Sequence, residues 1–280
     1  MIDLHTHSKA SDGSLSPSAL IEQACRRGLT AIALTDHDTI AGIEEAEREA
    51  EKQGLRFIPG IEIEIHWEPG EFHLLGLGIR RPSPAFLRAI SELAGLREAR
   101  NREIIERMQK ANIEVCYEDI LPLSGGHFIG RPHFATLLIN RGIVKNREQA
   151  FTRYLGKGRP FYVPKEGLEF RRAVDMIKDS GGITVLAHPM SLYIAWGRLP
   201  ELVKDFRDQG LDGIEAWHPT AKVRSCKRLD VLGKSLGLCI TAGSDFHGDS
   251  RPDRKLGITA GDRKIDEALL ETIPKLFNTK

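Results

Sequence analysis

The sequence predicts an α/β barrel with an inserted helical subdomain, and three observations support this fold. Short apolar runs alternate with amphipathic helical patterns at both ends of the chain, which indicates strand–helix units and a parallel sheet. Residues 83–158 carry helical patterns and no convincing strand. Histidine and carboxylate residues stand where several strands end, which favours a barrel over an open sheet, because barrel active sites are built there.

The chain is expected to begin with a short strand at residues 2–5. Ser16 and Pro17 offer an N-cap and a proline in the first turn, so a helix is expected to start there. Gly28 is expected to end that helix. The apolar run at residues 31–35 is typical of a buried parallel strand.

A second helix and a hairpin are expected next. Thr39 is the predicted cap of the helix, whose charged residues up to Lys52 we interpret as a solvated face. Residues 57–65 predict a third strand and residues 72–77 a fourth. Proline and glycine within 68–70 predict that the two strands pair as a hairpin.

A helical segment then interrupts the alternation. A long pattern of apolar residues at helical spacing begins at Ser83, and further helices are expected at residues 131–140 and 146–155. The expected domains are a discontinuous barrel at residues 1–82 and 159–280 and a helical insert at residues 83–158.

Strand–helix alternation resumes after the insert and continues to the end of the chain. The expected strands lie at residues 183–187, 213–216 and 238–242. The expected helices lie at residues 169–179, 200–208, 220–236 and 265–277.

Composition excludes several classes of protein. Forty Lys and Arg residues against thirty-nine Asp and Glu residues give a net charge of +1, which argues against bulk binding of duplex DNA. No apolar stretch is long enough for a membrane helix, and no secretory signal follows Met1, so a cytoplasmic protein is expected. The four cysteines are far apart and are expected to be reduced.

Metal-ligating residue types gather at the expected strand ends. They are His5, His7, Asp12, Asp36, His37, Glu62, His73, His188, Glu215, His218, Asp245 and His247. Alternate residues of a strand face the same side, so His5 and His7 converge on one point. Burying so many imidazoles and carboxylates together is costly unless cations neutralise them. The set therefore predicts a metal centre.

The ligand types narrow the choice of metal. Nitrogen and oxygen ligands without a nearby cysteine suit Mn²⁺, Zn²⁺ or Fe²⁺ rather than a thiolate-held zinc. The candidates are too many for one ion, and a carboxylate such as Glu62 can bridge two ions. We expect two or three divalent ions at close spacing.

The motifs, taken in order, resemble those of the PHP (polymerase and histidinol phosphatase) family. They are His5-Thr6-His7, Thr35-Asp36-His37-Asp38, Gly60-Ile61-Glu62, His188-Pro189 and Ser244-Asp245-Phe246-His247. The resemblance is closest to the branch of bacterial nucleoside 3′,5′-bisphosphate phosphatases and the 5′-to-3′ exoribonuclease RNase AM. Those proteins also carry a helical insert and a Gly-Arg-Pro-His segment, here residues 130–133.

The resemblance implies a distorted (β/α)₇ TIM-like barrel and a trinuclear metal centre. The first implied ligand set is His5, His7, Glu62 and Asp245. The second shares Glu62 and adds His73 and His188, and the third is Asp12, His37 and His247. Aspartate at position 12 is typical of the bisphosphate phosphatase branch, and its hard oxygen favours Mn²⁺.

The resemblance also implies phosphoester hydrolysis, in which a hydroxide bridging two cations is the nucleophile. Asp36 and His218 are the candidate catalytic residues for the leaving-group proton or for orienting ligands. Arg131, His133 and Lys157 are the candidates for binding a substrate phosphate, with Arg131 at a helix N-terminus. Trp217 is open to two interpretations, stacking on a base or packing in the core.

The favoured function is a metal-dependent phosphoesterase that removes the 3′-phosphate of 3′,5′-bisphosphonucleosides, giving the nucleoside 5′-monophosphate, or that degrades short single-stranded RNA from its 5′ end. One alternative is a histidinol-phosphate phosphatase or another amidohydrolase-like metal hydrolase. Another is a non-catalytic metal-binding or nucleic-acid-binding module. Every ligand position that the resemblance implies carries a suitable residue, which argues against the last alternative. The sequence leaves the oligomeric state open.

Overall fold

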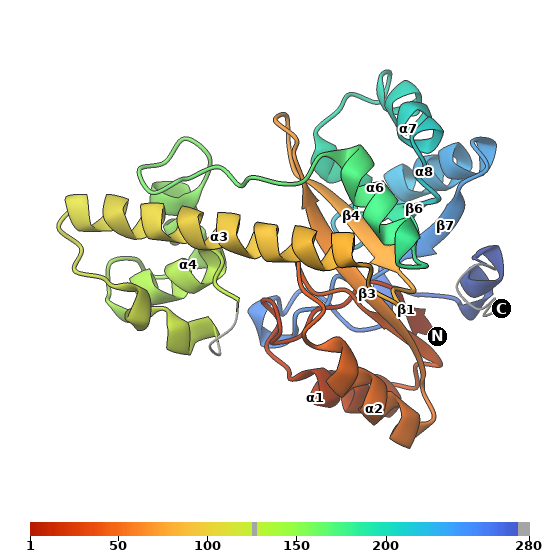
Figure 1. Ribbon diagram of the computed structural model, residues 1–280, viewed down its shortest axis with the longest axis horizontal. Helices are drawn as coiled ribbons and strands as arrows, with labels where there is room; N and C mark the ends of the chain where they lie inside the picture. The colour runs from red at the N-terminus through yellow and green to blue at the C-terminus, as the bar shows by residue number, and fades with distance from the viewer. Residues whose placement is uncertain (125–127, 274–280) are drawn as a thin grey trace. The chain divides into compact units, whose positions relative to one another are not determined.

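The computed structural model describes residues 1–124 and 128–273 (Figure 1). The chain divides into two compact units. The first unit joins Met1–Ile90 to Gly167–Lys280, and the second comprises Ser91–Glu166.

Seven strands of the first unit form one sheet in chain order. They are β1 (Ile2–Asp3), β2 (Ala31–Leu34), β3 (Arg56–Ile65), β4 (Phe72–Leu77), β5 (Ile183–Leu186), β6 (Gly213–Trp217) and β7 (Cys239–Ala242). All neighbours are parallel except β4, which is antiparallel to both β3 and β5. The predicted hairpin of the third and fourth strands is confirmed.

The sheet closes on itself just beyond its first and last strands. Thr6 forms a parallel bridge with Phe246, and the His7 amide donates to the Phe246 carbonyl at 2.9 Å. The predicted fold, a distorted seven-stranded α/β barrel with a helical insertion, is therefore confirmed.

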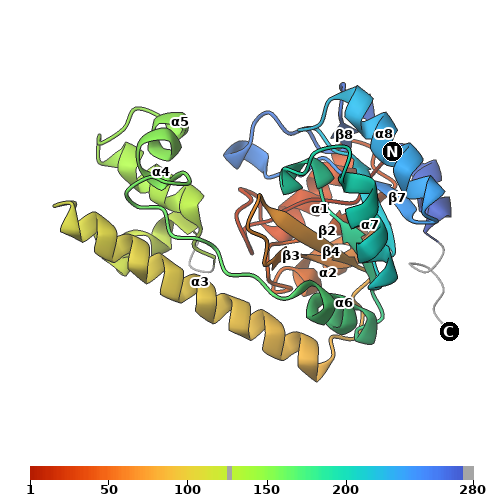
Figure 2. The ribbon, with the colours of Figure 1, turned by 90° about the horizontal axis from the view of Figure 1, so that it is seen from above.

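Helices surround the strands on the outside of the barrel (Figure 2). They are α1 (Pro17–Arg26), α2 (Ile43–Gln53), α6 (Phe170–Asp179), α7 (Leu199–Asp208) and α8 (Val223–Ser235). Alternate side chains of β2 face the interior of the barrel and the helices outside it. Ala31 and Ala33 belong to the barrel's inner core, whereas Ile32 and Leu34 pack with the apolar residues of α1 and α2.

The start of α1 agrees with the predicted cap, and the start of α2 does not. The Ser16 hydroxyl accepts a hydrogen bond from the Ala19 amide at 3.2 Å, as expected for a cap. The prediction that Thr39 caps α2 is wrong, because its hydroxyl accepts from the Ala41 amide at 3.1 Å and closes a turn before the helix. The helix begins later, after Gly42.

The predicted C-terminal helix at residues 265–277 is wrong over its described part. Residues Glu267–Thr272 form a 3₁₀ helix, η6, and the segment from residue 274 lies outside the described residues. The following Pro274 disfavours helical backbone at Ile273, which has a φ of −124°. A short hairpin, β8 (Ile258–Thr259) and β9 (Arg263–Lys264), precedes η6 and was not predicted.

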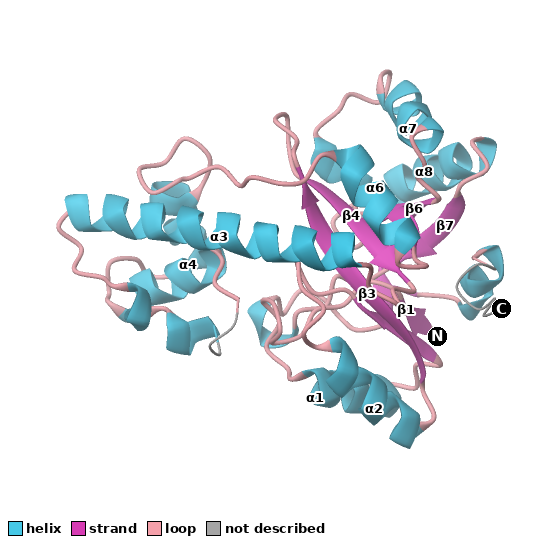
Figure 3. Ribbon diagram, in the orientation of Figure 1, coloured by secondary structure: helices cyan, strands magenta, loops and turns pink. Residues whose placement is uncertain are grey.

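The described residues of the second unit form helices and loops and include no strand (Figure 3). The long helix α3 (Pro84–Lys110) begins in the first unit and continues into the second. The remaining elements are η1 (Tyr117–Asp119), η2 (Leu121–Ser124), α4 (Arg131–Asn140), α5 (Arg147–Ala150) and η3 (Phe151–Leu155), a π-helical turn. Buried residues such as Phe134, Leu138 and Met108 form a separate apolar core.

Among the described residues, no helix combines the length and the apolar character that crossing a membrane requires.

Candidate metal centre

One edge of the barrel collects the predicted histidine and carboxylate residues. The carboxyl ends of the parallel strands meet at this edge, so residues that follow β1, β2, β5, β6 and β7 come together there. Since β4 runs the other way, its first residues reach the same edge, and His73 pairs with Glu64 across the β3–β4 ladder. The reversal of one strand thus adds a histidine to the cluster.

Four side chains from three parts of the chain surround a single point. The Nε2 atoms of His5 and His7 lie 3.1 Å apart, and each is 3.3 Å from Oε2 of Glu62. Oδ1 of Asp245 lies 3.7 Å from Nε2 of His5 and 3.4 Å from Nε2 of His7. One cation could therefore contact His5, His7 and Asp245 together, and both histidines also lie within 3.3 Å of Glu62.

The other oxygen of Glu62 belongs to a second group. Oε1 of Glu62 lies 2.8 Å from Nδ1 of His73 and 2.9 Å from Nε2 of His188. The two imidazole nitrogens are 3.2 Å apart. The two oxygens of Glu62 therefore face two different groups of nitrogens, as a carboxylate that bridges two cations does.

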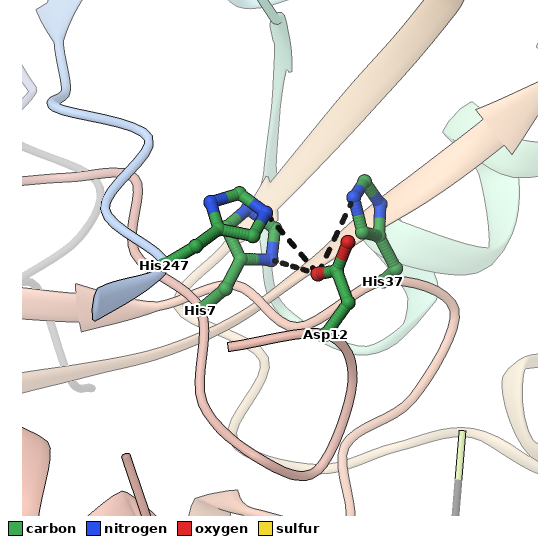
Figure 4. A group of neighbouring side chains, drawn as sticks. All are labelled: His7, Asp12, His37 and His247. Atoms are coloured by element: carbon green, nitrogen blue, oxygen red, sulfur yellow. Dashed lines mark ion pairs between the residues drawn. The ribbon is translucent and has the colours of Figure 1, made fainter. Parts of the chain in front are cut away.

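A third group gathers on Oδ1 of Asp12, as Figure 4 shows. Nε2 of His247 lies 3.1 Å from that oxygen, and Nδ1 of His7 and Nε2 of His37 each lie 4.0 Å from it. The histidines come from the segments after β1, β2 and β7. His7 stands between two groups, because its two nitrogens face different carboxylates.

Several buried polar atoms of the cluster make no hydrogen bond of acceptable geometry among the described residues. They are Nδ1 of His7, Oδ1 of Asp12, Oε2 of Glu62, Nε2 of His218 and Nε2 of His247. Leaving so many buried donors and acceptors unpaired is costly, and metal coordination would satisfy them. The residues present therefore fit a group of divalent cations.

The carboxylates of the cluster are held in their anionic form. Burial raises the pKa of Glu62, but the surrounding imidazoles, above all His37 and His73, outweigh it and hold that pKa well below its usual range. Burial likewise raises the pKa of Asp245, and His247 and its neighbours bring it well below the usual value. Anionic oxygens are what hard divalent cations bind.

The imidazoles are oriented by two further carboxylates, Glu215, which the sequence analysis counted among the candidates of the cluster, and Glu64, which it did not. Nδ1 of His5 lies 3.0 Å from Oε1 of Glu215, and Nε2 of His73 lies 3.0 Å from Oε2 of Glu64. Each bond fixes the tautomer and leaves the other ring nitrogen facing the cluster. The signal for Glu64 was present, since it is two residues from Glu62 on one strand and shares its face.

Two further histidines are fixed in the same way. Nδ1 of His188 is 2.8 Å from the Ser191 hydroxyl, and Nδ1 of His247 is 2.8 Å from the Asp245 carbonyl. Nε2 of His188 then faces Glu62, and Nε2 of His247 faces Asp12.

The two predicted catalytic residues lie in different surroundings. Asp36 is buried and accepts hydrogen bonds from the Ser8 amide, the Ser8 hydroxyl and the Ser11 hydroxyl, at 2.8, 2.7 and 2.5 Å. Its carboxylate thus holds the segment that leads to Asp12. His218 instead lines the pocket over the cluster, with Nε2 at 3.5 Å from Oδ2 of Asp245.

The cluster opens into a pocket of about 370 Å³. Its described lining residues are His37, Glu62, Glu71, His73, His188, Met190, Ser191, Tyr193, His218, Thr220, Asp245 and Arg251. Tyr193 is 76% exposed and has a left-handed φ of +52°. The pocket is therefore polar at its floor, with one exposed aromatic ring and one arginine in its walls.

The predicted phosphate-binding residues lie in the second unit. Arg131 begins α4, and Nδ1 of His133 accepts a hydrogen bond from the Gly130 amide at 3.0 Å. Lys157 follows η3. Their part in binding a substrate phosphate stays a prediction.

The structure decides between the two interpretations of Trp217. Its ring packs against the inner core of the barrel, and its Nε1 donates to Oδ2 of Asp230 at 3.0 Å. Packing is therefore the role that the contacts of Trp217 support.

The chain is similar to several known proteins. The sequence of residues 3–159 matches the family model of the PHP domain. A 5′-3′ exoribonuclease of Haemophilus influenzae is 38% identical over 245 residues, which cover 88% of this chain and 89% of that protein. A 3′,5′-nucleoside bisphosphate phosphatase of Chromobacterium violaceum is 32% identical over 259 residues, covering 92% and 91%.

A solved structure from Bifidobacterium adolescentis, provisionally described as a metal-dependent phosphoesterase, has a TM-score of 0.86 and 28% sequence identity to this chain. The superposition covers 97% of this chain and 94% of that one.

Proposed function

The chain belongs to the PHP domain family of metal-dependent phosphoesterases, and we propose that its substrates are 3′,5′-bisphosphonucleosides. It is a hydrolase of phosphoester bonds. The proposed reaction releases the 3′-phosphate and leaves the nucleoside 5′-monophosphate. The observation that carries the proposal is the buried cluster around Glu62, whose two oxygens face two groups of histidine nitrogens.

Three ligand sets are proposed for the cations. His5, His7, Glu62 and Asp245 form the first, and His73 and His188 join Glu62 in the second. Asp12, His37 and His247 form the third. The absence of sulfur ligands from these sets and the carboxylate of Asp12 favour Mn²⁺.

When bound, the cations polarise the phosphate oxygens and lower the pKa of water so that it attacks at neutral pH. The chain's own residues hold the geometry. Glu215 and Glu64 fix the rings of His5 and His73, and Asp36 holds the segment that presents Asp12. Preorganised ligands of this kind lower the barrier because no reorganisation is needed during the reaction.

His218 is proposed to donate a hydrogen bond to the oxygen that leaves the phosphorus. The Thr220 amide lies 3.3 Å from Nδ1 of His218, and an amide can only donate, so Nδ1 is the acceptor. The proton of the neutral ring is therefore on Nε2, the atom that faces Asp245 and the pocket. A hydrogen bond from this atom would stabilise the negative charge that develops on the oxygen leaving the phosphorus, whereas the neutral ring is too weak an acid to give up the proton itself.

Two observations support a nucleotide as the substrate. The Chromobacterium relative is named as a phosphatase of nucleoside bisphosphates, and its similarity extends over nearly the whole chain. The exposed ring of Tyr193 lines the pocket and offers a surface on which a base can stack.

A second candidate is 5′-to-3′ hydrolysis of short single-stranded RNA. It is favoured by the similarity to the Haemophilus exoribonuclease, which is 38% identical. Both reactions break a phosphoester bond of a ribonucleotide, so the same cluster serves either one.

The test compares substrates on one preparation of the Mn²⁺-loaded protein. We expect the highest kcat/KM for 3′-phosphoadenosine 5′-phosphate, a lower value for a 5′-phosphorylated oligoribonucleotide, and a value lower by at least about tenfold for histidinol phosphate and for a sugar bisphosphate without a base. Release of phosphate and of 5′-AMP is followed together by chromatography.

The reverse order, with RNA preferred, would replace the first candidate by the second. Preference for histidinol phosphate, or no turnover of any of the four compounds, would refute the proposed substrate class.

A further inference from the structure

We propose that Arg251 binds the phosphate group that is hydrolysed, by donating hydrogen bonds from its guanidinium to the non-bridging oxygens. The inference rests on the proposed function and extends it, because it adds a substrate-binding residue from the first unit that the sequence did not indicate.

Arg251 directs a permanent positive charge into the pocket above the cluster. It follows the short 3₁₀ helix η5 (Gly248–Ser250), and its side chain lines the same pocket as His188 and Asp245. The side chain is 36% exposed, so its head is neither buried in the protein nor free in bulk water. A phosphate resting on the cluster would lie within reach of the guanidinium.

The guanidinium is placed beside a carboxylate without forming a tight pair with it. Nη1 of Arg251 lies 3.8 Å from Oδ2 of Asp245, which is beyond hydrogen-bond distance. An arginine whose purpose is to pair with a carboxylate usually makes two parallel bonds at about 2.8 Å. Because Asp245 does not use the donors of Arg251 in this way, they remain available to a ligand.

The chemistry of arginine restricts what that ligand can be. A guanidinium has no acceptor atom and stays protonated, so Arg251 cannot coordinate a cation. Its planar set of N–H donors matches two oxygens of a tetrahedral phosphate. Cations bound to the cluster would offset the carboxylates beside Arg251, such as Asp245, and a phosphate in the pocket would then supply the negative charge that the guanidinium pairs with.

A second arginine lies near the same carboxylate. Arg254 is 8% exposed, and its Nε lies 4.0 Å from Oδ2 of Asp245 without a hydrogen-bond partner among the described residues. The Arg254 amide donates to the Arg251 carbonyl at 3.0 Å. Arg254 therefore places a second, buried guanidinium near Asp245, whereas Arg251 lines the pocket.

The segment that carries Arg251 is tied to the segment that carries Asp12. The Ser14 hydroxyl accepts from the Asp249 amide at 2.8 Å, and the Ser14 amide donates to the His247 carbonyl at 2.9 Å. Gly248 has a φ of +63°, and a Cβ there would lie 2.1 Å from the Ser14 hydroxyl oxygen. A glycine is thus required for this close approach, which fixes the backbone just before Arg251.

The test compares Arg251→Met and Arg251→Lys with the wild-type protein, all loaded with Mn²⁺. For 3′-phosphoadenosine 5′-phosphate, Arg251→Met should lose about 10²- to 10³-fold in kcat/KM, the usual effect of removing one donor to a developing oxyanion. Arg251→Lys should recover part of the loss, because it restores the charge but not the paired donors.

Two readouts separate this role from a structural one. The dissociation constant of inorganic phosphate, measured by calorimetry, should rise by about tenfold or more in Arg251→Met, while bound metal measured by mass spectrometry stays at the wild-type level. Lys255→Met is the matched control, since Lys255 is 59% exposed and pairs with Asp262 at 3.7 Å. That variant should behave like the wild type.

Wild-type phosphate affinity and kcat/KM in Arg251→Met would overturn the inference, and so would a loss of bound metal that accounts for the loss of activity. If the wild-type protein hydrolyses no phosphoester, the proposed function fails. The calorimetric comparison still decides whether Arg251 binds phosphate, so the two failures are distinguishable.

Discussion

At the scale of single residues, the site depends on groups that hold the histidines as much as on the histidines themselves. Glu215 accepts from Nδ1 of His5 through one oxygen and from the His188 amide, at 2.7 Å, through the other. One buried carboxylate therefore orients residues of two proposed ligand sets. Replacing Glu215 should therefore weaken metal binding, although Glu215 is in none of the proposed ligand sets.

Replacing Glu215 by glutamine should weaken metal binding by about 10- to 100-fold, the usual effect of losing a carboxylate that orients a ligating histidine. The amide keeps the size of the side chain but has one acceptor oxygen, so one of the two N–H groups loses its partner. Metal affinity is measured by competition with a chelating dye. Glu201→Gln, an exposed substitution on α7, is the control and should leave the affinity unchanged. An unchanged affinity in Glu215→Gln would contradict the orienting role.

The sequence predicted the proposed ligands and placed Glu215 among the candidates, but it did not show which histidine each supporting residue holds. His5, His188 and Asp245 each follow a short apolar run, which is a local pattern and visible without a structure. The contact between His5 and Glu215 joins positions 210 residues apart. Arg251 carries no such local signal either, since it lies in a loop of charged residues. Such partners can be found only when the strands are in register.

At the scale of elements, the segments that follow the strands are packed closely enough to set the cluster's geometry. Gly243 directly follows β7, and a Cβ there would lie 2.2 Å from Cβ of His5 and 2.7 Å from Oε1 of Glu215. The end of β7 thus packs directly against His5, a proposed ligand, and Glu215, which orients it.

Gly243→Ala should therefore displace the end of β7 from His5. We expect a loss of about 1–3 kcal/mol in the free energy of unfolding, which is typical of overpacking, together with weaker metal binding. Denaturant unfolding and metal titration measure the two effects. Gly197→Ala, where a Cβ meets nothing within 4 Å, should change neither. Equal behaviour of the two variants would show that the close packing at Gly243 has no consequence.

Element types were predicted better than element ends. The hairpin of β3 and β4 follows from two apolar runs around a turn, and the structure has it. The two-residue strands β8 and β9 are too short to show any alternation, so no pattern could reveal them. Thr39 has the chemistry of a cap, but several residues around it allow a turn, and the helix starts only after Gly42.

At the scale of the whole chain, closure of the sheet creates the site. The bridge between Thr6 and Phe246 brings the first and last strands together, and with them His5, His7 and Asp245. The sequence indicated strand–helix units, but hydrogen bonds between the chain's two ends have no sequence pattern of their own. The placement of polar residues and the resemblance to a family were what favoured a closed barrel.

The central claim is that the cluster at this edge of the barrel is a centre of several metal ions that hydrolyses phosphoesters. The most direct test is to remove metal with a chelator, add Mn²⁺ back stepwise, and follow phosphate release from 3′-phosphoadenosine 5′-phosphate together with bound metal. Activity should vanish on chelation and return in full only with two or more ions per chain, whereas Asp245→Asn should stay inactive at every metal concentration. Full activity in the chelated wild-type protein, or full activity in Asp245→Asn, would contradict the account.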